Sequence, residues 1–107
     1  MSFRYLGILT ITPGTPIKLS TQFPNEKGVE FNSLIVSQKR GNAGFVFIGA
    51  ASMTGEANAS FTIPPASASA VPYANINLSA ASNPLTIDTF AIDGTAAEIV
   101  QISTMVN

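Results

Sequence analysis

The stretch VQISTMV, residues 100–106, carries an apolar or β-branched side chain at every second position. Successive side chains of a strand point to opposite faces, so this pattern predicts a strand with one buried and one exposed face. Ile17 and Leu19 alternate with polar neighbours in the same way, and no long segment shows helical periodicity. Ile, Val and Thr, which favour strands, make up 27 of the 107 residues. The chain is therefore predicted to be mostly β.

Working outward from this stretch, we predict eight short strands, at residues 3–12, 16–21, 29–38, 45–51, 58–63, 74–79, 85–92 and 98–106. Turn-forming residues separate them: a tight connection at 13–16, a loop at 24–28, a hairpin at 40–44 with residues that tolerate positive φ, and a turn at Asp93 and Gly94. A chain of 107 residues has room for one core. The prediction is a single all-β domain over residues 1–107, an antiparallel β-sandwich of the jelly-roll type.

Residues 57–87 contain no charged side chain, and 21 of these 31 are Ala, Ser, Asn or Pro. Pro64 and Pro65 cannot donate hydrogen bonds to a ladder, so residues 64–70 are predicted to form an extended connection between two sheets. The uncharged stretch has two interpretations. It is an ordinary Greek-key crossover, or it faces another protein, because charged residues are depleted at interface cores.

The sequence contains no His, Cys or Trp. This composition removes the commonest general base, the thiolate nucleophile and most soft metal ligands. No nucleotide-binding motif and no nucleophile elbow occur. Asp88, Asp93 and Glu98 could form a carboxylate pair or a site for a hard cation, although a turn and soluble strand faces explain them as well. We therefore predict a protein that is not an enzyme and that uses no cofactor, metal or small-molecule substrate.

Residues 39–47, KRGNAGFVF, echo the basic and aromatic signature of RNA-recognition motifs. However, Asn42 replaces the first stacking aromatic residue, and the two helices of that fold are not predicted. The net charge is −1, with +3 on residues 1–40 and −4 on residues 41–107, so we expect no nucleic-acid partner. The longest run of small or apolar residues, 43–51, is about half of what a membrane-spanning helix needs, and we expect no membrane partner.

The segment FVFI, residues 45–48, is apolar at four successive positions. A strand with two apolar faces has to be covered on both sides. One cover is the opposite sheet, and the other is either a loop or a second subunit. Phe45 and Phe47, together with Tyr73 from the uncharged stretch, are therefore the candidate residues of a subunit interface.

Four segments carry a resemblance to a known family: GNAGFVFIG at 41–49, INLS at 76–79, TFAIDG at 89–94 and VQI at 100–102. They resemble segments of small all-β virion structural proteins of tailed bacteriophages, which include capsid decoration or cement proteins. In that family a turn of the type Asn-x-Gly precedes an aromatic-aliphatic strand that ends in Gly, and a later pair of strands spans a Gly-containing turn. The resemblance implies a jelly-roll domain, commonly a homotrimer, that sits on the outside of the phage head and clamps major capsid subunits.

The same resemblance implies that the major capsid protein is the partner and that the protein is made in the bacterial host cytoplasm before it joins the head exterior. We expect Arg4, Lys39 and Arg40 to contact acidic capsid patches, because all five basic residues lie within residues 1–40. The alternative is a tail, neck or fibre module that binds a receptor glycan. Tyr5 and Tyr73 are the two tyrosines available for such a site, and exposure of both rings on one face would favour it.

Overall fold

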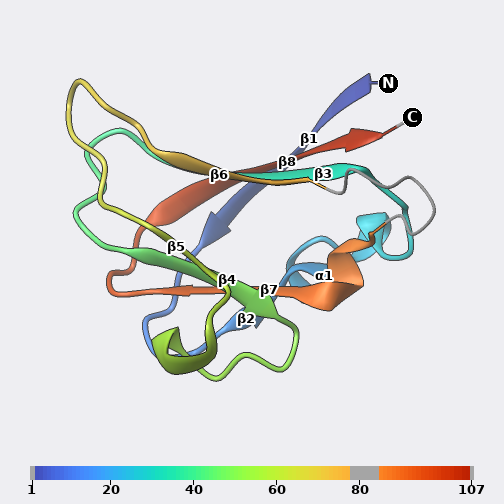
Figure 1. The fold of residues 1–107 in the computed structure, drawn as a ribbon, viewed down its shortest axis with the longest axis horizontal. Helices are drawn as coiled ribbons and strands as arrows, with labels where there is room; N and C mark the ends of the chain where they lie inside the picture. The colour runs from blue at the N-terminus through green and yellow to red at the C-terminus, as the bar shows by residue number, and fades with distance from the viewer. Residues whose placement is uncertain (1, 78–84, 107) are drawn as a thin grey trace.

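Two four-stranded antiparallel sheets pack face to face in the computed structural model, which describes residues 2–77 and 85–106 (Figure 1). One sheet has the order β1-β8-β3-β6, formed by Ser2–Thr10, Ile99–Val106, Ser33–Gln38 and Tyr73–Asn77. The other has the order β2-β7-β4-β5, formed by Ile17–Lys18, Phe90–Gly94, Val46–Ala50 and Phe61–Ile63. The predicted all-β sandwich is confirmed.

Strand pairing follows one rule along the chain: β1 pairs with β8, β2 with β7, β3 with β6 and β4 with β5. The chain is thus a long hairpin whose tip lies between β4 and β5. Each of its arms changes sheet from one strand to the next, so the two arms wrap together around a common core. This wrapping is the topology of a jelly roll.

The expected strand at 16–21 is wrong beyond Lys18, because the chain turns into a short helix, α1, over Leu19–Gln22. The Leu19 side chain is buried, and its carbonyl accepts a hydrogen bond from the Phe23 N–H at 2.8 Å. Pro24 then begins a 3-10 turn, η1, over Pro24–Glu26, where the missing proline N–H costs nothing. The apolar position at Leu19 therefore serves a helical turn as well as it would serve a strand.

Three other expected strands are shorter than predicted, and the one expected at 58–63 begins only at Phe61, as β5. Residues 29–32 add only an isolated bridge between Phe31 and Leu85 before β3 begins at Ser33. The expected strand at 85–92 begins only at Phe90, after a 3-10 turn, η3, over Ile87–Thr89. A further 3-10 turn, η2, covers Glu56–Asn58. The expected strand over 74–79 is present as β6 up to Asn77, and its last two residues lie outside the described residues.

Two of the predicted connections are confirmed, and two of the predicted turns are wrong. At residues 13–16 the connection is tight, with a bridge between Thr12 and Thr15. Residues 64–72 cross from β5 in one sheet to β6 in the other, as predicted. Residues 40–44 do not form a hairpin, because β3 and β4 belong to different sheets, although Gly41 has the expected positive φ of 87°. Asp93 and Gly94 do not form a turn either, because they are the last two residues of β7 and pair with β4.

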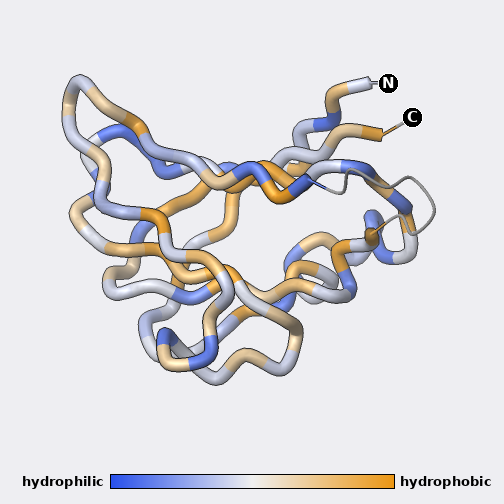
Figure 2. The backbone as a smooth tube through the Cα atoms, in the orientation of Figure 1, coloured by the Kyte–Doolittle hydropathy of each residue, from blue (hydrophilic) through white to orange (hydrophobic). Residues whose placement is uncertain are grey.

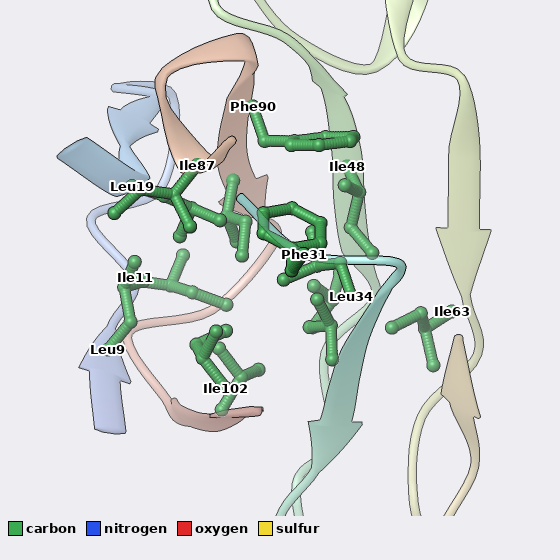
Figure 3. Close-up of a cluster of buried hydrophobic side chains, with 14 residues drawn as sticks. Leu9, Ile11, Leu19, Phe31, Leu34, Ile48, Ile63, Ile87, Phe90 and Ile102 are labelled. Carbon is green, nitrogen blue, oxygen red and sulfur yellow. The ribbon is translucent and has the colours of Figure 1, made fainter. Parts of the chain in front are cut away.

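The core lies between the two sheets, and hydrophobic residues recur along the strands of both (Figure 2). In β8 the predicted alternation is confirmed, since Val100, Ile102 and Thr104 are buried. Figure 3 shows side chains from both sheets meeting in one cluster. Phe31 and Phe90 lie within it, with ring centroids 6.2 Å apart. The inner faces are thus occupied by packing, so surfaces for partners have to be sought on the outer faces.

Candidate interaction surface

The outer face of the β1-β8-β3-β6 sheet follows from strand register, because directly opposed residues in a sheet point to the same side. Three rows of opposed residues cross the sheet. They are Phe3, Met105 and Ser33; Tyr5, Ser103, Ile35 and Asn75; and Ile8, Gln101, Ser37 and Tyr73. These rows alternate with the buried residues of β8, so they point away from the core. We call them the outer face.

The outer face has exposed aromatic residues on both edge strands and a mixture of polar and apolar residues on the two central strands. Phe3 and Tyr5 on β1 are 64% and 59% exposed, and Tyr73 on β6 is 65% exposed. Ile8 adds a third exposed apolar residue on β1. Contiguous exposed apolar groups on a soluble domain mark interaction surfaces. The sheet therefore presents an apolar surface that residues 2–77 and 85–106 do not cover.

A bulge in β1 determines which residues reach this face. The register shifts between Tyr5 and Gly7, so Leu6 has no opposed residue in β8. Without the extra residue, Tyr5 and Ile8 would point to opposite sides, because they are three positions apart. Gly7 adopts a φ of 138°, which residues with a Cβ rarely adopt. The bulge thus brings the aromatic and aliphatic residues of β1 to one side.

None of the chain's five basic and six acidic side chains occupies an outward position in these four strands. Arg4 lies on β1 but at an inward position, opposite Thr104. Its guanidinium is paired with the Glu26 carboxylate of η1. The outer face is therefore free of charge within its strands, and Lys39 and Arg40 follow directly after the end of β3.

The three basic residues expected to contact a capsid do not form one cluster. Lys39 and Arg40 are exposed at the end of β3, whereas Arg4 lies level with Leu34 near its beginning. That separation along the strand is about 15 Å at about 3.3 Å per residue. Arg4 is also paired with Glu26, so of these three residues only Lys39 and Arg40 offer unpaired positive charge among the described contacts.

The three residues expected at a subunit interface lie in different surroundings. Tyr73 is on the outer face, and Phe45, which is 45% exposed, precedes β4. Phe47 is only 4% exposed, because it packs with Met53, Ala59 and Ala91 of its own chain. Of the two covers considered for the 45–48 strand, the loop after β4 is the one present. Phe47 consequently offers no surface to a second subunit.

Of the three carboxylates that could have formed a catalytic pair or a cation site, Asp93 and Glu98 have other contacts, whereas the buried Oδ1 of Asp88 has no hydrogen-bond partner among the described residues. Asp93 is buried, and its Oδ1 accepts a hydrogen bond from the Gly14 N–H at 3.1 Å. Glu98 accepts hydrogen bonds from the N–H groups of Ala43 and Gly44, both at 2.7 Å. Over residues 2–77 and 85–106 no group of three or more potential metal-ligating side chains is present. Asp93 and Glu98 thus hold connections in place.

Three outward residues, Phe3, Ile8 and Ile35, were not predicted from the sequence to lie on the surface, whereas Met105 follows from the alternation predicted for residues 100–106. The alternation of Phe3 and Tyr5 was a usable signal, because both belong to one face of a strand. Ile8 could not be assigned in the same way, since the bulge at Gly7 changes the phase of β1. Ile35 resembles an ordinary core residue in sequence, and only the pairing of β3 with β8 places it outward.

Comparison with known proteins yields no relative, since no family model, no curated protein and no solved structure matches the chain. Among the described residues, no helix has the length and apolar character that crossing a membrane would require.

Proposed function

We propose that this protein is a non-enzymatic structural protein of a bacteriophage virion, a capsid cement protein that binds the outside of the major capsid shell as a homotrimer. The observation that carries the homotrimer of this proposal is the charge-free outer face with its exposed aromatic residues, Phe3, Tyr5 and Tyr73. Such a surface suits contact with protein, and interface cores are enriched in aromatic residues and depleted in charge. The phage context rests on the resemblance of residues 41–49 and the three later segments.

The jelly-roll fold suits this role because both of its inner faces are filled by the core and its outer surfaces remain available. A cement protein acts by mass action: binding to the assembled shell, and not to its separated subunits, lowers the free energy of the assembled state. A trimer whose three copies each touch the shell also gains avidity through effective concentration. Modest contacts at each copy are then sufficient.

The proposal is tested by mixing the purified protein with expanded heads of the phage that encodes it and measuring co-sedimentation and head rupture on heating. We expect saturable binding and a higher rupture temperature. Unexpanded shells and heads of an unrelated phage are the controls. Absence of binding to expanded heads, at both low and moderate salt, would contradict the proposal.

A second experiment examines the basic residues in capsid contact. In the triple variant Arg4→Ser, Lys39→Ser, Arg40→Ser, we expect lower head occupancy at low salt and a weaker dependence of occupancy on salt, since surface charges act within about 10 Å at 0.1 M salt. The single variant Arg4→Ser should have the smaller effect, because Arg4 is paired with Glu26. Unchanged occupancy of the triple variant at both salt concentrations would remove these residues from the contact.

One observation favours the alternative function, a tail, neck or fibre module that binds a receptor glycan. Tyr5 and Tyr73 are both exposed on the outer face, with Gln101, Ser103 and other polar residues between them. Aromatic rings beside polar groups are the usual elements of sugar recognition. Because the chain has no Trp, sugar binding can be followed directly by tyrosine fluorescence. Loss of a sugar-induced change in both Tyr5→Ala and Tyr73→Ala would support this function over the capsid one.

A further inference from the structure

We propose that a neighbouring copy of this chain covers the outer face, and that it does so with the narrow side of its sandwich formed by β5, residues 64–72 and β6. We call this region the β5-β6 side. The inference rests on the proposed homotrimer and specifies its contact: the outer face of one copy meets the β5-β6 side of the next. The contact is heterologous, and with a three-fold rotation between copies it closes a ring of three.

The β5-β6 side is the second uncharged surface of the molecule. The structure places the described part of the uncharged stretch, residues 57–77, along one side, where the chain passes from one sheet to the other (Figure 1). Phe61 and Val71 are 43% and 37% exposed there. β6 is an edge strand of its sheet, so this side is continuous with the outer face at Tyr73.

The absence of charge on both surfaces indicates which partner fits. The charged groups of a partner would lose their hydration on contact with the outer face. The outward positions in the strands of this face carry no opposite charge that would compensate for this loss. A second copy that presents its β5-β6 side brings no charged side chain of residues 57–77 into the contact. The two surfaces of this chain therefore match each other in their lack of charge, which is the property that most restricts the choice of partner.

The size of the outer face favours a ring over a face-to-face pair. Four strands about 4.8 Å apart and about six residues long give a flat footprint of about 400 Å². A stable interface buries about 800 Å² on each partner, which the outer face does not reach at one contact, whereas a ring gives each copy two contacts. A pair joined through two outer faces would use this footprint once and leave Phe61 and Val71 exposed. In a ring each copy contributes both surfaces, which covers both apolar patches.

Native mass, measured by light scattering on a sizing column, tests the contact. Wild type should have three times the chain mass of 11.1 kDa. Tyr5→Lys alters the outer face, and Phe61→Lys alters the β5-β6 side; each should reduce the species to the chain mass, with an unchanged circular dichroism spectrum. Val29→Lys is the matched control, because Val29 is also exposed but lies outside both surfaces, and it should remain trimeric. A monomeric wild type overturns the inference, and so does a Phe61→Lys variant that remains associated.

Cross-linking provides a second readout that does not depend on weakening the contact. The chain has no Cys, so introduced thiols are the only ones present. Ser103→Cys lies in the centre of the outer face and Ser69→Cys lies on the β5-β6 side. With a short bismaleimide, the double variant should give covalent dimers and trimers, and each single variant should give none. Covalent dimers from Ser103→Cys alone would indicate face-to-face pairing and overturn the inference.

These outcomes separate the contact from the proposed function. A wild-type trimer that fails to bind expanded heads contradicts the cement function and leaves the contact between copies supported. A monomer that binds heads contradicts the contact and leaves capsid binding supported. A trimer would also cover Tyr5 and Tyr73, so the glycan alternative predicts a chain whose outer face remains free in solution.

Discussion

Gln38 shows how a buried polar side chain can hold two connections of the sandwich. It is fully buried at the end of β3, and its Nε2 donates to the carbonyl oxygens of Gly44 and Pro64 at 2.9 and 3.0 Å. Its Oε1 accepts from Asn42 Nδ2 at 2.8 Å. The amide thus joins the connection after β3 to the connection after β5. Buried polar groups are stable only when they are satisfied in this way.

Replacing Gln38 with Leu should lower the free energy of unfolding by about 2–4 kcal/mol, because two carbonyl oxygens and the Asn42 amide each lose a partner in a buried place. Urea unfolding followed by circular dichroism measures the change. Gln22→Leu, at an exposed position of α1, is the control and should change stability by less than about 0.5 kcal/mol. A loss below about 1 kcal/mol in Gln38→Leu would show that water replaces the amide.

At the scale of the element, the register and facing of β1 depend on the bulge at Gly7 more than on the strand propensity of its residues. Gly7 has a φ of 138°, and a Cβ at this position would lie 3.2 Å from Cε1 of Phe23. The bulge therefore requires a residue without a side chain both for its backbone conformation and for its packing. It also sets the phase that brings Ile8 to the outer face beside Tyr5.

Gly7→Ala should destabilise the protein by about 1–2 kcal/mol, since a residue with a Cβ is strained at positive φ. Gly55→Ala is the matched control. Gly55 has an extended backbone, and a Cβ added there would meet nothing within 4 Å, so the substitution should be neutral or stabilise by up to about 1 kcal/mol. Thermal and urea unfolding of both variants gives the comparison. Equal effects of the two substitutions would contradict the role given to the bulge.

The sequence predicted elements well where side-chain alternation is uninterrupted, as in β8, and where a continuous apolar run indicates a strand covered on both faces, as in β4. It failed where one apolar residue serves two structures equally well, as Leu19 does for a strand or a helical turn. It also failed at Asp93 and Gly94, whose turn chemistry is overridden by pairing with β4. The outer face could be predicted only in part, because it depends on which strands become neighbours and on a bulge, and both are determined by contacts distant in sequence.

At the scale of the whole molecule, the two ends of the described chain are neighbours, since Ser2 of β1 is opposite Val106 of β8 (Figure 1). This pair is the most distant in sequence of all the strand pairs, and β8 also pairs with β3 on its other side. Contacts between distant residues slow folding, because the chain has to close a long loop before they form. The jelly roll is therefore expected to fold on the slow side for its size.

A circular permutant tests this dependence on chain order. Joining the two ends through a short Gly-Ser linker and opening the chain between Lys27 and Gly28, in an exposed turn, turns β8 and β1 into a local hairpin. The native pairing is kept, so we expect the same circular dichroism spectrum and similar native packing. Stopped-flow refolding should be roughly several-fold faster than that of the original chain, because the longest loop closure has become the shortest. A permutant opened between Ile102 and Ser103, inside β8, is the control and should not fold, since it divides the strand that joins β1 to β3. An intact permutant that refolds no faster would show that β1 and β8 pair only after the rate-limiting step.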